Sequence, residues 1–212
     1  MKSSKTQFEQ ELYDPSGRRT NIIFIGMSGS GKTHWARLLA QEFEYEHIEF
    51  DNLIGNSDGL AELIKGFPGK DKAEKMGNYF GMPWDAGFES KERIFLDIEK
   101  KFMSQQYGPG VIIDLTGSCI SHPGQMESIS NSGIVIYLET SQEKQREMFQ
   151  IFMKNPKPVC WGGVFSKKAA ETNEQALERS FPLLLKHRAN LYQQFANVTL
   201  PYAAHKNATN PG

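Results

Sequence analysis

A glycine-rich octapeptide carries the strongest chemical signal in the sequence. Residues 26–33 read GMSGSGKT and fit the phosphate-loop pattern G-x-x-x-x-G-K-[ST]. The loop follows an apolar stretch, 21–25, and opens an amphipathic one, 32–43. In that setting the loop amides, the N-terminal end of the helix dipole and the Lys32 ammonium converge on the β- and γ-phosphates of a nucleotide. The sequence therefore predicts a nucleoside triphosphate site.

Individual residues of this loop have separate expected roles. Lys32 should stabilise charge on the transferring phosphoryl oxygens, and Thr33 should offer its hydroxyl to Mg²⁺. His34 falls in the first helical turn, with its side chain expected to face away from the phosphates. The predicted nucleotide contacts are Gly26, Ser28, Gly29, Ser30, Gly31, Lys32, Thr33 and His34.

Two aspartates lie where the chain leaves predicted strands. Asp51 closes the segment 47–51 and Asp114 closes the segment 111–114. Because the carboxyl ends of parallel strands share one edge of a sheet, both should lie beside the phosphate loop. Asp114 follows a hydrophobic run, as does the aspartate that positions Mg²⁺ in many phosphate-loop enzymes. Asp51 is expected to orient an acceptor hydroxyl. A helix cap or turn residue at Asp51 and a solvent-facing carboxylate at Asp114 are the alternatives.

A segment rich in lysine, proline and glycine spans residues 154–163, at the start of a possible lid of about residues 154–172. Its glycines could hinge a lid, with Lys154 and Lys157 covering the transferring phosphoryl group. An ordinary solvated loop explains this composition equally well. Trp161 is expected to pack beneath the segment rather than stack on a ligand.

Short apolar segments alternate with amphipathic ones along the chain. Strands are predicted at 21–25, 47–51, 111–114, 134–138 and 197–200, and helices at 32–43, 88–103, 124–130, 141–153 and 173–195. Such alternation indicates parallel βαβ units and hence an α/β, three-layer αβα sandwich. The helix 88–103 is expected to bury Ile94, Phe95, Ile98 and Phe102. No helix or strand is assigned to the glycine-dotted stretch 52–87.

Composition and length favour one globular domain. The 212 residues are 39% apolar and 23% charged, and a formal net charge of −1 argues against nucleic-acid or membrane partners. The two cysteines, Cys119 and Cys160, make no disulfide or metal pattern, and no signal peptide or membrane-length segment is evident. We expect a soluble cytoplasmic monomer or homodimer. Its parts would be a polar lead-in (1–20, with a short helix near 6–13), one domain (21–204) and a flexible tail (205–212).

Other motifs narrow the class of phosphate-loop protein. Residues 114–117 read DLTG, which meets the Asp-x-x-Gly pattern of GTPases, but the base-reading motif Asn-Lys-x-Asp occurs nowhere. The chain is too short for a large AAA-type or helicase motor. A small phosphotransferase and a non-catalytic nucleotide-binding module remain.

Two further segments resemble the shikimate kinases, a family of small phosphate-loop kinases within the nucleoside-monophosphate-kinase-like group. Beside the loop segment IIFIGMSGSGKTHWARLLA and the IEFD that follows it, these are GIVIYLETSQEKQ (133–145) and RANLYQQFANVTL (188–200). The resemblance extends over about residues 21–200. It implies a five-stranded parallel sheet in the order 2-3-1-4-5, with ATP and Mg²⁺ bound. It also implies transfer of the γ-phosphoryl group to a hydroxyl of a small metabolite.

The resemblance also implies roles for single residues. Asp51 matches the carboxylate that holds acceptor hydroxyls, and Arg188 matches the arginine that grips the acceptor carboxylate. Gly117 falls in the turn that lines the acceptor site. Lys157 lies where the lid has an arginine, and Glu49 lies where the family has another aspartate near the metal.

Departures from the family pattern concern the acceptor side. Glu89 stands in place of a second arginine that holds the acceptor carboxylate, and 116–118 reads TGS instead of three glycines. Acceptor recognition is therefore expected to have changed, while the nucleotide side is intact. A nucleotide or nucleoside kinase of the same fold stays an alternative, although 52–87 contains no arginine to bind an acceptor phosphate. An ATP-binding sensor or pseudokinase that has lost transfer is the other.

Overall fold

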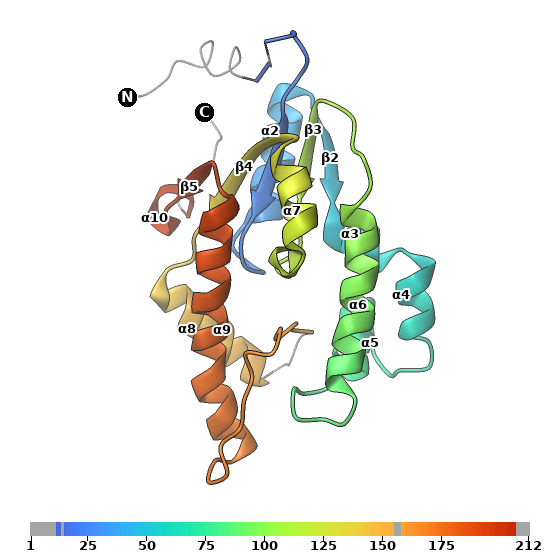
Figure 1. The fold of residues 1–212 in the computed structure, drawn as a ribbon, viewed down its shortest axis with the longest axis vertical. Coiled ribbons are helices and arrows are strands. Elements are labelled where there is room, and N and C mark those ends of the chain that lie inside the picture. The colour runs from blue at the N-terminus through green and yellow to red at the C-terminus, as the bar shows by residue number, and fades with distance from the viewer. Residues whose placement is uncertain (1–11, 14, 155–157, 207–212) are drawn as a thin grey trace.

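A five-stranded sheet forms the centre of the computed structural model, which describes residues 12–13, 15–154 and 158–206 (Figure 1). Its order, β2-β3-β1-β4-β5, confirms the order expected from the sequence. Each strand runs parallel to its neighbours. The strands are β1 (Asn21–Ile25), β2 (Glu46–Glu49), β3 (Val111–Asp114), β4 (Gly133–Leu138) and β5 (Val198–Leu200).

Helices occupy most of the remaining described chain. They are α2 (Lys32–Phe43), α3 (Phe50–Gly55), α4 (Asp58–Leu63), α5 (Lys72–Phe80), α6 (Phe88–Met103), the 3₁₀ turn η1 (Cys119–Ser121), α7 (Pro123–Ser130), α8 (Gln142–Lys154), α9 (Asn173–Phe195) and α10 (Tyr202–His205). The expected bounds of α2, α6 and α9 are confirmed at both ends, and those of α7 and α8 differ by one residue. The Ser141 hydroxyl accepts a hydrogen bond from the Lys144 amide at 3.1 Å, as expected of a helix cap.

Alternate side chains of β1 pack into two separate hydrophobic clusters, one on each face of the sheet. Ile22 and Phe24 pack with α2 on one face, while Ile23 and Ile25 join the larger core on the other. Figure 1 shows α2 behind the sheet, with α7 and α9 in front of it. A strand that is buried on both faces therefore leads directly into the glycine-rich loop.

The stretch 52–87 contains helices that the sequence analysis did not assign. The strand expected to reach Asp51 ends at Glu49, and α3 begins at Phe50. Phe50 and Ile54 are both buried, and their spacing of four residues places them on one helical face against the core. Asp51 consequently lies in the first turn of a helix and not at the end of a strand.

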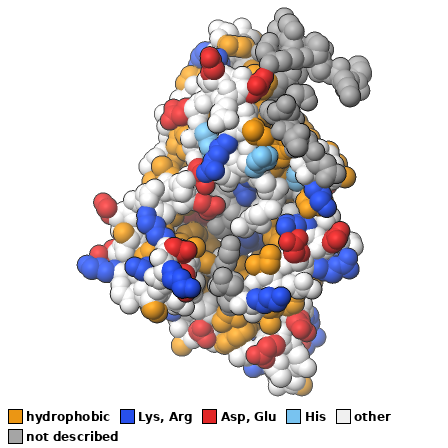
Figure 2. Space-filling view, turned by 180° about the vertical axis from the view of Figure 1, so that it is seen from behind, with side chains coloured by type: hydrophobic (Ala, Val, Ile, Leu, Met, Phe, Trp, Pro, Cys, Tyr) orange, Lys and Arg blue, Asp and Glu red, His pale blue; other side chains and the backbone are white. Residues whose placement is uncertain are grey.

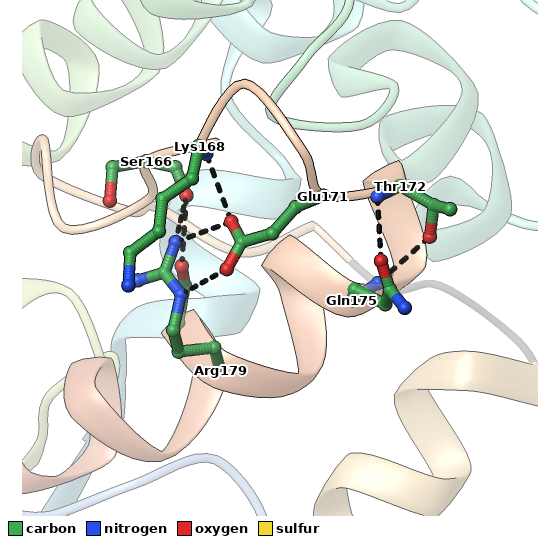
Figure 3. Close-up of polar contacts among 7 residues, drawn as sticks. Ser166, Lys168, Glu171, Thr172, Gln175 and Arg179 are labelled. Atoms are coloured by element: carbon green, nitrogen blue, oxygen red, sulfur yellow. Dashed lines mark hydrogen bonds and ion pairs between the residues drawn. The ribbon is translucent and has the colours of Figure 1, made fainter.

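Polar contacts fix the entry into α9 (Figure 3). Thr172 and Gln175 form a capping box, in which each side chain accepts a hydrogen bond from the other residue's backbone amide, at 3.2 and 2.9 Å. Arg179 donates to Glu171 at 2.7 Å and to the Ser166 carbonyl at 2.7 Å. The segment that precedes α9 is thus tied to the helix it enters.

Two expectations about the chain ends are only partly covered by the described residues. Most of the expected helix near 6–13 lies outside them, as do 207–212 of the expected tail. The expectation that a flexible tail starts at residue 205 is wrong. His205 is the last residue of α10, is buried, and has a ring nitrogen 2.9 Å from the Glu139 carbonyl oxygen. Among the described residues, no helix has the length and apolar character needed to cross a lipid bilayer. The start of the domain at residue 21 stays a prediction.

Candidate active site

Glycine is required at the start of the phosphate loop. Gly26 has φ +143°, and a Cβ atom placed there would lie 2.8 Å from the Leu138 carbonyl oxygen of β4. Gly29 and Gly31 also have positive φ values, of +76° and +99°. A loop that curls this tightly between β1 and α2 needs residues without side chains at these points.

The N-terminal end of α2 is arranged to accept an anion. Its N-cap residue, Gly31, has no side chain to satisfy the amides of the first turn, and that turn contains no acidic residue. Lys32 is buried, and its ammonium donates hydrogen bonds to the carbonyls of Gly26 and Met27 at 3.1 and 3.2 Å. Uncapped amides and a lysine at the same helix end suit the phosphates of a nucleotide.

Thr33 and Asp114 form a compact pair of oxygen ligands beside the loop. The Thr33 hydroxyl donates to an Asp114 carboxylate oxygen at 2.5 Å. Asp114 is 4% exposed, and burial raises its pKa from 3.8 to about 6, against the opposing effect of Lys32. Hard oxygen ligands such as these fit Mg²⁺ that is also bound by nucleotide phosphates. No cluster of three or more His, Cys, Asp or Glu residues suited to a metal occurs within the described chain.

A cavity of about 450 Å³ adjoins the loop. Its walls include Met27 and Ser28 of the loop, Asp51 of α3, Thr116 to Ser118 after β3, and Arg188 of α9. The structure thus brings the three predicted acceptor residues, Asp51, Gly117 and Arg188, around one space. The Asp51 side chain is exposed at this space, and partial desolvation by the surrounding protein raises its pKa against the opposing effect of Lys32.

Gly117 and Arg188 are held close together. The Tyr192 hydroxyl donates to the Gly117 carbonyl at 2.6 Å, which ties the turn after β3 to α9. A Cβ atom on Gly117 would lie 3.6 Å from an Arg188 guanidinium nitrogen and 3.4 Å from the Ser28 amide nitrogen. Arg188 also donates a hydrogen bond to the Cys160 carbonyl. The loop, the turn and α9 therefore meet at Gly117.

Two buried glutamates of α6 support this region, and the sequence analysis missed both. Glu99 is fully buried and accepts hydrogen bonds from the hydroxyls of Thr116 and Ser118, which flank Gly117. Its second oxygen lies 2.9 Å from the His122 ring. Glu92 accepts hydrogen bonds from the backbone amides of Trp161 and Gly162. In the sequence, each looks like one more charged residue of an amphipathic helix.

Other predicted site residues lie outside the cavity. His34 is exposed, with its ring against Trp35 at a centroid distance of 5.6 Å, and Glu49 is paired with Arg37 at 2.7 Å. Lys157 lies outside the described residues. Glu89 is exposed on α6 and does not line the cavity.

The expected packing role of Trp161 is confirmed, since it is 2% exposed and lies in the core. The face shown in Figure 2 mixes acidic and basic side chains without a broad area of one sign, in keeping with a net charge of −1.

Nucleotide phosphates at the loop and a second small molecule in the cavity would meet at Ser28, because this residue borders both sites. That arrangement, on a sheet of order 2-3-1-4-5, defines a phosphate-loop kinase. A family model described as shikimate kinase matches residues 66–209, and one described as an AAA domain matches residues 22–94. Since the former covers more than half of the chain, the protein belongs to the shikimate kinase family.

Individual relatives agree with this assignment. The chain is 28% identical over 184 residues to the shikimate kinase of Haemophilus influenzae, covering 86% of this chain and 83% of that protein. The shikimate kinase of Pasteurella multocida is likewise 28% identical over 184 residues, with 86% of each chain covered. The protein is therefore a kinase that phosphorylates a hydroxyl of a small metabolite with ATP. Neither the nucleotide-kinase nor the sensor alternative is better supported.

Solved structures show the same fold. The shikimate kinase from Acinetobacter baumannii in complex with shikimate aligns with a TM-score of 0.50 at 21% identity, covering 91% of this chain and 85% of that one. The shikimate kinase from Bacteroides thetaiotaomicron aligns with a TM-score of 0.51 at 17% identity, covering 86% of each chain.

Proposed function

We propose that the enzyme transfers the γ-phosphoryl group of Mg·ATP to a hydroxyl of a small acid related to shikimate, bound in the 450 Å³ cavity. The observation that carries this proposal is the shared boundary of the two sites. Ser28 of the phosphate loop and Asp51 of α3 line the same cavity, so a bound hydroxyl could approach the γ-phosphate directly.

On the nucleotide side, the loop amides and Lys32 would stabilise charge on the phosphoryl oxygens. For Lys32 this means exchanging its contacts with the carbonyls of Gly26 and Met27 for phosphate oxygens. Thr33 and Asp114 would hold Mg²⁺, which supplies positive charge to the phosphates when bound. The resemblance to the shikimate kinases implies that Lys157 lies in a lid that excludes water, and this role stays part of the proposal.

On the acceptor side, Asp51 would accept a hydrogen bond from the reacting hydroxyl and orient its oxygen. Burial raises the pKa of Asp51, and a more basic carboxylate is better suited to draw a proton from the hydroxyl during transfer. Gly117 leaves room for the acceptor beside the Arg188 guanidinium. Support for an acidic acceptor comes from the Acinetobacter baumannii enzyme, whose structure contains shikimate.

The buried and unpaired thiols of Cys119 and Cys160 fit a reducing compartment, so we place the enzyme in the cytoplasm.

The proposal is tested by following ADP release from Mg·ATP in the presence of small hydroxylated metabolites, with shikimate and gluconate among them. At least one acceptor should raise turnover well above the rate with ATP alone. Asp51→Asn should lower kcat by roughly 10²- to 10⁴-fold with little change in KM for ATP. Binding of ATP without acceptor-stimulated turnover across the panel would favour the sensor alternative.

A further inference from the structure

The cavity contains more positive than negative charge. Among the described residues, its charged lining side chains are Asp51, Lys72 and Arg188. Asp51 is assigned to the reacting hydroxyl under the proposed function, which leaves two cations for the rest of the acceptor. Lys72 is exposed and Arg188 is half-buried, so a ligand that covers them is favoured if it carries a negative group to pair with their charges.

Lys72 reaches the cavity from the start of α5, within the stretch that the sequence analysis left unassigned. Its ammonium donates to the Asn56 side-chain carbonyl at 2.6 Å, and Asn56 lines the same wall. Within the described part of the chain, no carboxylate pairs with Lys72. One hydrogen bond to a neutral amide orients the ammonium but leaves its charge available.

Arg188 contributes the second cation from α9. It donates to the Cys160 carbonyl and lies beside Gly117, and it also has no carboxylate partner among the described residues. Glu89, the acidic residue in the first turn of α6, is exposed and does not line the cavity. Its negative charge therefore does not cancel either cation across the cavity.

We propose that Lys72 is a specificity-determining residue that binds the acceptor carboxylate together with Arg188. This inference rests on the proposed function and assigns to it a residue that no motif in the sequence indicated. The carboxylate would replace Asn56 as a partner of the Lys72 ammonium. Selectivity for acids over neutral polyols then depends on two cations from helices far apart in the chain.

The test compares Lys72→Met with Lys75→Met, since Lys75 lies on the same helix but does not line the cavity. Each protein is assayed with two matched pairs, shikimate against its methyl ester and gluconate against glucose. The unmodified enzyme should prefer the acid of at least one pair. Lys72→Met should lower kcat/KM for that acid by roughly 10- to 100-fold, the usual worth of a hydrogen bond to a charged group.

Three further results should accompany that loss. Lys72→Met should keep kcat/KM for the neutral partner and KM for ATP within about 3-fold of the unmodified enzyme. Lys75→Met should keep all rates within about 2-fold, and Lys72→Arg should retain most of the activity on the acid. Equal losses on acid and neutral partner, or an unchanged rate on the acid, would overturn the role of Lys72. A preference for the neutral partner in both pairs would overturn it as well.

Failure of the proposed function would appear differently. In that case no compound of either pair would stimulate ADP release by the unmodified enzyme, although ATP still binds. That result would remove the inference together with the function on which it rests, before any variant is compared.

Discussion

Asp114 is a carboxylate whose surroundings disfavour its charge. Burial raises its pKa from 3.8 to about 6, while its pairing with Thr33 and the nearby Lys32 act in the opposite direction. Between these two pKa values the folded protein binds more protons than the unfolded chain. The free energy of unfolding should therefore fall as the pH rises from about 4 to 6, and stay lowered above that range.

This predicts a gain in stability at the expense of activity for Asp114→Asn. At pH 7, without metal or nucleotide, the variant should be more stable by about 1–2 kcal/mol, because the buried charge is removed. Near pH 4 the difference should vanish. Urea denaturation at both pH values measures it, and equal gains at the two pH values would refute burial of the Asp114 charge as the cause.

Glu99, unlike Asp114, is a buried carboxylate that several polar side chains contact. Thr116, Ser118 and His122 all contact it, so its removal would leave His122 without this partner, and Thr116 and Ser118 with only a 3.5 Å contact to each other. Glu99→Ala should therefore lower the free energy of unfolding by about 3–5 kcal/mol.

The matched control is Asp97→Ala, at an exposed position of the same helix, with an expected change within about 0.5 kcal/mol. Denaturant titration of both variants gives the comparison. A loss at Glu99 no larger than that at Asp97 would show that the buried contacts contribute nothing to stability.

At the scale of elements, Gly26 and Gly124 cannot be told apart by residue type, but the backbone needs glycine only at Gly26. Gly26 needs φ +143° and lies against the Leu138 carbonyl, whereas Gly124 lies in α7, where an added Cβ would meet no atom within 4 Å. Gly26→Ala should weaken ATP binding at least 10-fold, because the loop must open to admit the methyl group.

Gly124→Ala should instead raise stability by about 0.5–1 kcal/mol with unchanged ATP affinity. Calorimetry with Mg·ATP and thermal unfolding separate the two effects. Normal ATP affinity in Gly26→Ala would contradict the tight approach of the loop to β4.

The long, periodic elements could be predicted from the sequence, and the short ones could not. The strand 21–25, with its apolar run 22–25, and the 23-residue helix α9 each carry enough pattern to fix their bounds. Helices α3 and α4 have six residues each and are interrupted by glycines. Helices this short depend on tertiary packing rather than on local preference, so their pattern is weak.

The buried face of α6 was predicted only in part. Phe95 is buried as expected, but Ile94 is 43% exposed, and Glu92 and Glu99 occupy the buried face. A pattern of apolar residues cannot reveal a carboxylate whose partners come from distant loops. Asp51, Gly117 and Arg188 could be predicted to lie together because family motifs mark them, whereas Lys72 lies in a stretch without such a motif.

At the scale of the whole molecule, the site exists only in the folded chain. Its cavity is lined from the loop at 26–33, from α3 and α5, from the turn after β3, and from α8 and α9. Figure 1 shows α6 and α9 extending beyond the same end of the sheet. Ligands that bind between such elements stabilise the folded state as a whole.

Mg·ATP should therefore raise the melting temperature. At 100 times its Kd the gain is about 2.7 kcal/mol, or roughly 5–10 °C for a chain of this length. Lys32→Ala should lose most of this shift, while its melting temperature without ligand changes little in comparison. Differential scanning fluorimetry makes both measurements, and an equal shift in the variant would contradict the assignment of Lys32.

Identification of the phosphorylated product tests the proposed transfer most directly. The enzyme is incubated with Mg·ATP and an acid acceptor such as shikimate or gluconate, and the mixture is followed by ³¹P NMR. We expect a new phosphate-monoester signal that grows in step with ADP and is absent with Asp51→Asn. Formation of inorganic phosphate alone, or a monoester signal of equal rate in that variant, would contradict the transfer to a bound acceptor hydroxyl.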